Sequence, residues 1–130
     1  MTTDATASAI LSLEAVAAQQ ARAVVRGLCE EAVVAADSVD TAVLLTSELV
    51  ANAVIHGGGP TTLDARVQGS RLRITVGDHS SQPPVVVRTR HTPHADEGGR
   101  GLFLVSVLAS RWGYAPSATA KTVWFELDLN

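Results

Sequence analysis

The stretch from Glu48 to Gly57, ELVANAVIHG, constrains this sequence more than any other part of it. It reads as the second half of a helix that we expect to begin near Asp37 or Ser38, either of which can cap the first turn. At about 100° per residue, apolar side chains surround this helix almost completely, which is typical of a buried element. Glu48 and Asn52 lie one turn apart on one side of this helix.

A carboxylate and a carboxamide on a buried helix need partners, because an unpaired buried charge is strongly unfavourable. A hydrated Mg²⁺ ion is one such partner, since it prefers oxygen ligands and usually keeps most of its waters. The alternative is a helix rim at which both side chains simply meet solvent. The helix by itself does not decide between these two interpretations.

The length and the composition of the chain indicate one globular domain: it has 130 residues, of which 46% are hydrophobic and 18% charged. We expect a disordered N-terminus at 1–8 and a single domain at 9–130. The net charge is −3 and the basic residues are scattered along the chain, so nothing indicates a nucleic-acid partner. The sequence shows neither a signal peptide nor an apolar run of spanning length, which indicates a cytoplasmic protein with no membrane partner.

The clearest local pattern is a β-hairpin. Apolar and polar residues alternate from Thr62 to Gln68 and again from Arg71 to Val76, and Gly69-Ser70 turns the chain between them. Since strands with one apolar face and helices with one apolar stripe pack in layers, we predict a two-layer α/β (α+β) sandwich. Its mixed, mostly antiparallel sheet has three helices on one face. The other expected elements are helices at 14–31, 37–56 and 102–111, strands at 9–13 and 123–129, and a short strand that Trp112-Gly113-Tyr114 leads into.

Two features follow the hairpin. Asp78 has the same parity as Val76, so its carboxylate points to the core side where the strand ends. It is either an ordinary cap of the next turn or an acceptor for the amino group of a ligand. Residues 80–98 lack periodicity, which in a loop of this length is typical of a functional or mobile segment. The glycines of Gly98-Gly99-Arg100-Gly101 then either punctuate the loop or let backbone N–H groups approach phosphate oxygens.

A Glu-x3-Asn helix, an inward Asp at a strand end, an irregular loop and a Gly-rich helix start occur here in that order. This combination resembles the ATP-binding domain of the GHKL superfamily, the Bergerat fold shared by gyrase, histidine kinases and MutL. The chain is most similar to the stand-alone anti-sigma-factor serine/threonine kinases and to small actinobacterial ATP-binding regulatory proteins. The most specific pieces of the resemblance are ELVANAVIHG, GGRGLFLVSVLASRWG and KTVWFEL.

The resemblance implies a role for individual residues. Asn52 would ligate the Mg²⁺ that bridges the ATP phosphates, and Glu48 would act as the general base. Asp78 would accept the adenine amino group, and Thr122, or Lys121 beside it, would lie near the adenine. The loop at 80–98 would form a lid over the nucleotide. The phosphates would be held by Gly99, Arg100, Gly101 and Leu102.

Two functions follow from the resemblance. The first is an enzyme: an ATP- and Mg²⁺-dependent serine/threonine kinase that phosphorylates an antagonist (STAS-type) protein and thereby regulates transcription, with a sigma factor as a further partner. The alternative is a non-catalytic ATP-binding or nucleotide-free anti-sigma-like binding module. Glu48 favours the enzyme, whereas His79-Ser80-Ser81-Gln82, where the family often has glycines, favours the module. Formation of a homodimer is left open.

Overall fold

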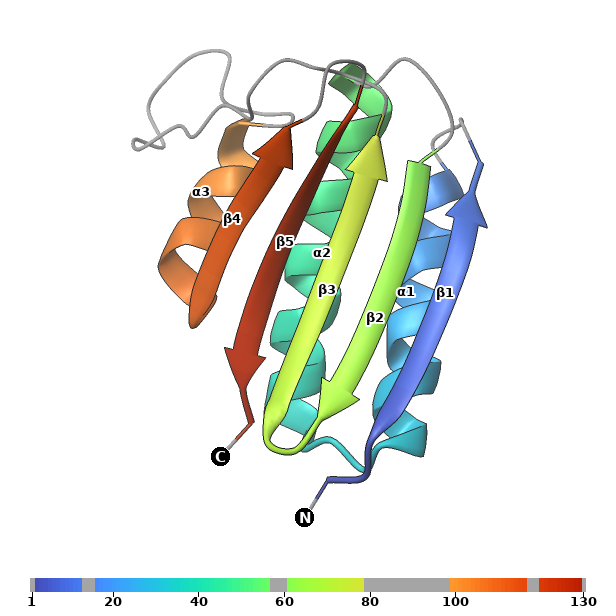
Figure 1. The fold of residues 1–130 in the computed structure, drawn as a ribbon, viewed down its shortest axis with the longest axis vertical. Helices are drawn as coiled ribbons and strands as arrows, with labels where there is room; N and C mark the ends of the chain where they lie inside the picture. Colours follow the sequence, from blue (N-terminus) through green and yellow to red (C-terminus); the bar gives the residue numbers. More distant parts are fainter. Residues whose placement is uncertain (1, 13–15, 57–60, 79–98, 117–119, 130) are drawn as a thin grey trace.

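The computed structural model describes residues 2–12, 16–56, 61–78, 99–116 and 120–129. Within these ranges the chain forms five strands and three helices, and Figure 1 shows their arrangement. The elements in chain order are β1 (Ala5–Leu11), α1 (Val16–Glu31), α2 (Ala36–His56), β2 (Thr61–Gln68), β3 (Arg71–Asp78), α3 (Gly99–Leu108), β4 (Arg111–Pro116) and β5 (Lys121–Asp128).

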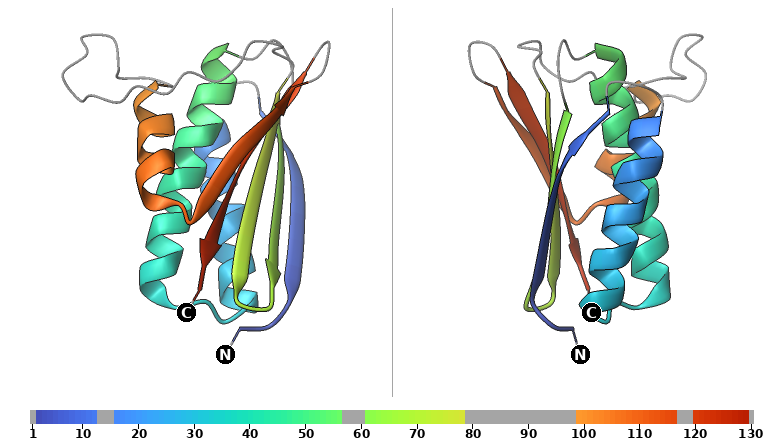
Figure 2. Two further views of the ribbon diagram at one scale, coloured as in Figure 1. Left: turned by 60° about the vertical axis from the view of Figure 1, so that its left-hand side comes forward. Right: turned by 90° about the vertical axis from the view of Figure 1, so that its right-hand side faces the viewer.

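The strands form one sheet in the order β1-β2-β3-β5-β4. The three helices cover one face of this sheet and leave the other face open (Figure 2). The predicted two-layer sandwich with three helices on one face is therefore confirmed. The sheet was expected to be mixed, but each pair of neighbouring strands in the described part of the chain is antiparallel.

β2 and β3 form the predicted hairpin. Leu63 lies opposite Val76 and Ala65 lies opposite Ile74, so the apolar residues of both strands share one face. Burial alternates residue by residue along β2, as the period of two in the sequence indicates. The turn contains Gly69 with a φ of 61°, a left-handed conformation that glycine adopts without a steric penalty.

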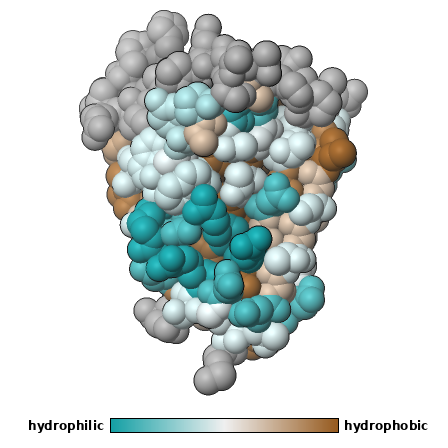
Figure 3. All heavy atoms as spheres, viewed as in Figure 1, coloured by the Kyte–Doolittle hydropathy of each residue, from teal (hydrophilic) through white to brown (hydrophobic). Residues whose placement is uncertain are grey.

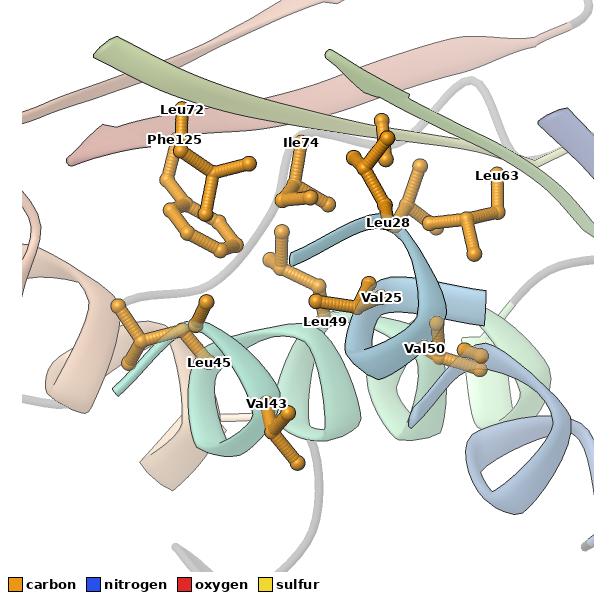
Figure 4. Close-up of a cluster of buried hydrophobic side chains, with 14 of the residues drawn as sticks. Val25, Leu28, Val43, Leu45, Leu49, Val50, Leu63, Leu72, Ile74 and Phe125 are labelled. Atoms are coloured by element: carbon orange, nitrogen blue, oxygen red, sulfur yellow. The ribbon is translucent and has the colours of Figure 1, made fainter. Parts of the chain in front are cut away.

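The core lies between the sheet and the helices. Figure 4 shows Leu72, Ile74 and Phe125 pointing from the sheet toward Leu45 and Leu49 of α2, and these five side chains are almost completely buried. Burying one such side chain stabilises the fold by roughly 1.5–3 kcal/mol relative to leaving it exposed. These contacts fix α2 against β3 and β5, and they thereby fix the polar residues that α2 carries.

The structure corrects two boundaries. β1 begins at Ala5 rather than at Ala9, because Ala5 and the next residues pair with β2, so the disordered segment predicted at 1–8 is too long. α3 begins at Gly99 rather than at Leu102 and ends before β4, which takes up the predicted end of that helix at Arg111. No helix among the described residues has the length and apolarity that crossing a membrane requires.

Candidate functional site

Four elements that are far apart in the sequence end or begin at one edge of the sandwich. In Figure 1 the end of α2, the end of β3, the start of α3 and the start of β5 all lie at the upper edge. Apart from the predicted lid, these elements carry every residue for which the sequence analysis predicted a role. The fold thus gathers the predicted site residues at one end of the molecule.

Asn52 is the most buried polar residue of α2 near this edge, with an exposed fraction of 5%. Its neighbours Leu49 and Ala53 belong to the hydrophobic core. No hydrogen bond joins the Asn52 carboxamide to another residue in the part of the chain that the structure describes. Because buried amides generally have partners, this position suits a ligand that brings polar atoms or a hydrated cation. Glu48, one turn earlier, is half-buried.

A cation at this edge would depend on few protein ligands. Among the described residues, no three His, Cys, Asp or Glu side chains gather in a way that could hold a metal ion. Mg²⁺ suits such a place, because it typically binds one or two protein oxygens and completes its shell with water and substrate phosphates. The carboxamide oxygen of Asn52 therefore fits the predicted Mg²⁺ ligand in its chemistry.

Asp78 points into the molecule, as its parity predicts, with an exposed fraction of 4%. The register of β3 and β5 places Lys121 directly opposite, and its Nζ lies 3.0 Å from Oδ2 and 3.3 Å from Oδ1 of Asp78. Each buried charge is thus compensated by the other. A carboxylate can accept about four hydrogen bonds, so pairing with Lys121 is compatible with accepting from a ligand's amino group as well.

Thr122 lies on the other side of the sheet. It pairs with Gly77, and its methyl group is 3.6 Å from the point that a Cβ on Gly77 would occupy. Alternation along β5 places Thr122 on the open face with Trp124, whereas Lys121 faces the helices. Of the two neighbours that the sequence offered for the adenine site, Lys121 is the one that contacts Asp78.

The predicted phosphate-binding residues form the start of α3. Gly99, Arg100 and Gly101 make its first turn, where backbone N–H groups have no acceptor within the helix and the helix dipole is positive. The Leu102 side chain is fully buried in the core, so Leu102 anchors this turn against the core. The predicted lid at 80–98 lies outside the described residues.

Residues 11–127 match the model of a protein family that is described as the histidine kinase-like ATPase domain. The chain belongs to the histidine kinase-like ATPase domain family. This confirms the predicted resemblance and implies an ATP-binding domain. All the predicted site residues lie inside the matched range.

A solved structure shows the same fold as this histidine kinase-like ATPase domain. The crystal structure of the RsbU and RsbW domains of Rv1364c from Mycobacterium tuberculosis is similar with a TM-score of 0.75 and 21% sequence identity. The likeness covers 96% of this chain but 32% of that one, so this chain spans about a third of its length. A search of curated protein sequences found no match.

Proposed function

We propose that this domain binds ATP with Mg²⁺ and transfers the γ-phosphate to a serine or threonine of an antagonist (STAS-type) protein, and so regulates a sigma factor. The observation that best supports the proposal is the burial of Asn52 and Asp78 at the edge where α3 begins. Polar side chains that are buried at one end of a hydrophobic core are expected where a polar ligand is bound.

Asp78 is the proposed adenine acceptor. An ionised carboxylate only accepts hydrogen bonds, so it suits the exocyclic amino group of adenine and disfavours the oxygen that guanine carries at the same position. Lys121 compensates the charge of this carboxylate in a place that solvent hardly reaches. The Asp78 carboxylate therefore favours ATP over GTP.

Asn52 and the first turn of α3 are the proposed phosphate end of the site. The carboxamide oxygen of Asn52 would hold Mg²⁺, which neutralises phosphate charge when it is bound. The N–H groups at the start of α3 would donate to phosphate oxygens. Glu48 lies one turn from Asn52 and is half-buried, and it would accept the proton of the attacking hydroxyl. In phosphoryl transfer such positioning and charge neutralisation supply most of the catalysis.

One observation favours a second candidate, a binding module without catalysis. Asp78 and Lys121 compensate each other's charge within the chain, so this part of the fold does not require a nucleotide for its stability. In such a module the same edge would bind a partner protein, and ATP would be a structural ligand or have no role.

Two measurements separate these candidates. Calorimetric titration of ATP and of GTP, each with Mg²⁺, should show ATP binding at least about tenfold more tightly, a difference of about 1.4 kcal/mol. Incubation with radiolabelled ATP should then label an antagonist protein of the STAS type. ATP binding without transfer to any protein or to water would establish the binding module. Absence of ATP binding would overturn the nucleotide site itself.

A further inference from the structure

The open face of the sheet gathers basic side chains that are scattered in the sequence. We call Arg66, Arg71, Arg73 and Arg111 the arginine patch; they are four of the ten lysine and arginine residues in a chain whose net charge is −3. Figure 3 shows strongly hydrophilic residues gathered over the lower half of this face. The candidate nucleotide site lies elsewhere, at the upper edge and on the helix side of the sheet.

Glu126 lies at the centre of this patch, and its side chain is 11% exposed. Arg73 donates to its Oε2 and Arg111 to its Oε1, both at 2.8 Å, and the Arg71 Nε lies 3.9 Å from Oε1. The hydrogen bond from Arg111 is the main cause of a lowered pKa of Glu126. These contacts hold two guanidinium groups in fixed positions on an exposed sheet.

Trp124 holds Arg73 from a second side. The guanidinium carbon of Arg73 lies 4.2 Å from the centroid of the Trp124 ring, a cation–π contact. The ring lies against Gly113 on β4, where an added Cβ would come within 2.9 Å of it. Gly113 therefore leaves room for the ring, and the ring with Glu126 orients Arg73.

The positive charge of Arg66, in contrast, is not compensated by an ion pair within the described residues. It lies directly opposite Arg73 in the pairing of β2 and β3, and like charges in this position destabilise a sheet. Arg66 forms no ion pair with any residue in the described ranges. The sheet thus carries positive charge that its own carboxylates do not neutralise.

A hollow of about 540 Å³ opens between these arginines. Its size admits a few side chains of another molecule, and three arginines against one carboxylate give its lining a net positive charge. The hollow is lined by Arg66, Gln68, Ser70, Arg71, Arg73 and Glu126.

We propose that this hollow binds an acidic segment of a partner protein, whose Asp or Glu side chains pair with Arg66 and Arg73. Guanidinium groups match carboxylates in a two-pronged geometry, and Arg73 is already held in place for such a contact. A nucleic acid suits the surface less well. Its affinity comes from several phosphates along a basic track, and here Glu126 and Asp128 interrupt the arginines.

The test uses Trp124 as a reporter. The chain has two tryptophans, and Trp112→Phe leaves Trp124 as the single one. This variant is titrated at low salt with an end-capped octapeptide of glutamate, and in parallel with one of glutamine. The glutamate peptide should change Trp124 fluorescence saturably, and 0.5 M NaCl should weaken its binding at least about tenfold, because exposed charges are screened. The glutamine peptide should have no effect.

Matched variants locate the contact. In the Trp112→Phe background, Arg66→Gln should weaken binding of the glutamate peptide about tenfold, which is the loss of about one charged contact. Arg26→Gln removes one exposed arginine from α1, in the helix layer, and should leave binding within about twofold. Arg66→Gln should also raise the thermal midpoint by roughly 1–3 °C, because it removes the like-charge pair, so its loss of binding is not a loss of folding.

Three results would overturn the proposal. The first is no fluorescence change with the glutamate peptide at millimolar concentration. The second is an equal loss of affinity in Arg66→Gln and Arg26→Gln, which would indicate attraction without a site. The third is tighter binding of an octamer of single-stranded DNA than of the glutamate peptide, which would assign the hollow to nucleic acid.

Discussion

The ammonium group of Lys121 lies 3.0 Å from Oδ2 of Asp78, and the two residues are 43 positions apart in the sequence. Both side chains are 2% exposed. A buried ion pair adds little net stability, because each ion loses its water, but removal of one partner leaves an uncompensated buried charge. The proposed adenine acceptor is therefore also a structural residue, and a change at this position affects folding as well as binding.

This coupling is testable with a double-mutant cycle. Asp78→Asn and Lys121→Met should each lower the free energy of unfolding by about 3–5 kcal/mol, because each leaves one charge buried without its partner. The double variant should lose much less than the sum, since neither charge remains. Urea denaturation of the four proteins measures the effect. Additive losses would mean that the two side chains do not depend on each other.

The cycle also supplies the control for nucleotide binding. If Lys121→Met binds ATP as the wild type does and the folded double variant does not, the loss comes from the missing carboxylate and not from unfolding or from the missing ammonium group. An unchanged ATP affinity in the double variant would contradict the role of Asp78 as the adenine acceptor.

The direction of Asp78 was predictable and its partner was not. Strand parity is a local property, so the apolar residues of β3 suffice to place the Asp78 side chain on the core side. The partner depends on the register between β3 and β5, and no short turn fixes that register as it does in the β2–β3 hairpin. The resemblance placed Thr122 or Lys121 near the adenine without naming a partner for Asp78, and the register shows that Lys121 is the residue opposite it.

The same reason explains which parts of the arginine patch could be predicted from the sequence. Arg66 and Arg73 are neighbours in a hairpin whose turn is evident, so their pairing across the two strands follows from the sequence. The approach of Arg111 and Glu126 does not, because it needs the positions of β4 and β5 in the sheet. The early start of β1 at Ala5 was missed because its small residues give little alternation in hydrophobicity, and pairing with β2 alone defines that strand.

Val33 provides a test of local backbone strain. Its φ of 59° is left-handed, which is unfavourable for a β-branched residue, and its side chain is 63% exposed. Val33 lies just after the end of α1, where the N–H of Val34 donates to the Cys29 carbonyl at 3.0 Å. In this type of helix end, the position that Val33 occupies is usually glycine. Val33→Gly should raise the free energy of unfolding by about 1 kcal/mol, measured by urea denaturation. Val34→Gly should lower it, because Val34 packs against the core.

The lowered pKa of Glu126 predicts that the free energy of unfolding depends on pH. Its pKa is lowered in the folded protein, mainly by the hydrogen bond from Arg111, so its charged form is favoured by folding. Its contribution is therefore complete above the ordinary pKa of about 4.5 and is lost as the pH falls through the lower folded value. Glu126→Gln should destabilise the protein at pH 7, by about 1–3 kcal/mol, and the difference from wild type should shrink between pH 4.5 and pH 2.

Urea denaturation of both proteins across this pH range provides the measurement. Glu31→Gln, which removes an exposed carboxylate from α1, is the control and should reproduce the pH profile of the wild type. A constant difference between wild type and Glu126→Gln down to pH 2 would show that the charge of Glu126 does not contribute.

Glu48 and Asn52 lie one turn apart on α2, but substitutions at the two positions should have different effects on ATP binding and on phosphate transfer. Asn52→Ala removes the proposed Mg²⁺ ligand, so the Mg²⁺-dependent part of the ATP affinity should fall together with any phosphate transfer. Glu48→Gln keeps the size of the side chain but cannot take a proton. ATP binding should therefore survive, while transfer falls on the order of 10²- to 10⁴-fold for a lost general base.

Calorimetry with and without Mg²⁺, run beside radiolabelled transfer assays, separates the two effects. Glu48→Gln should bind ATP at least as well as the wild type, because a carboxylate near the terminal phosphate is repulsive before the reaction begins. An equal loss of ATP affinity in both variants would mean that both residues serve binding alone, as in the non-catalytic module. Full transfer activity in Glu48→Gln would show that the proton goes elsewhere, and a base outside the α2 pair would then have to accept it.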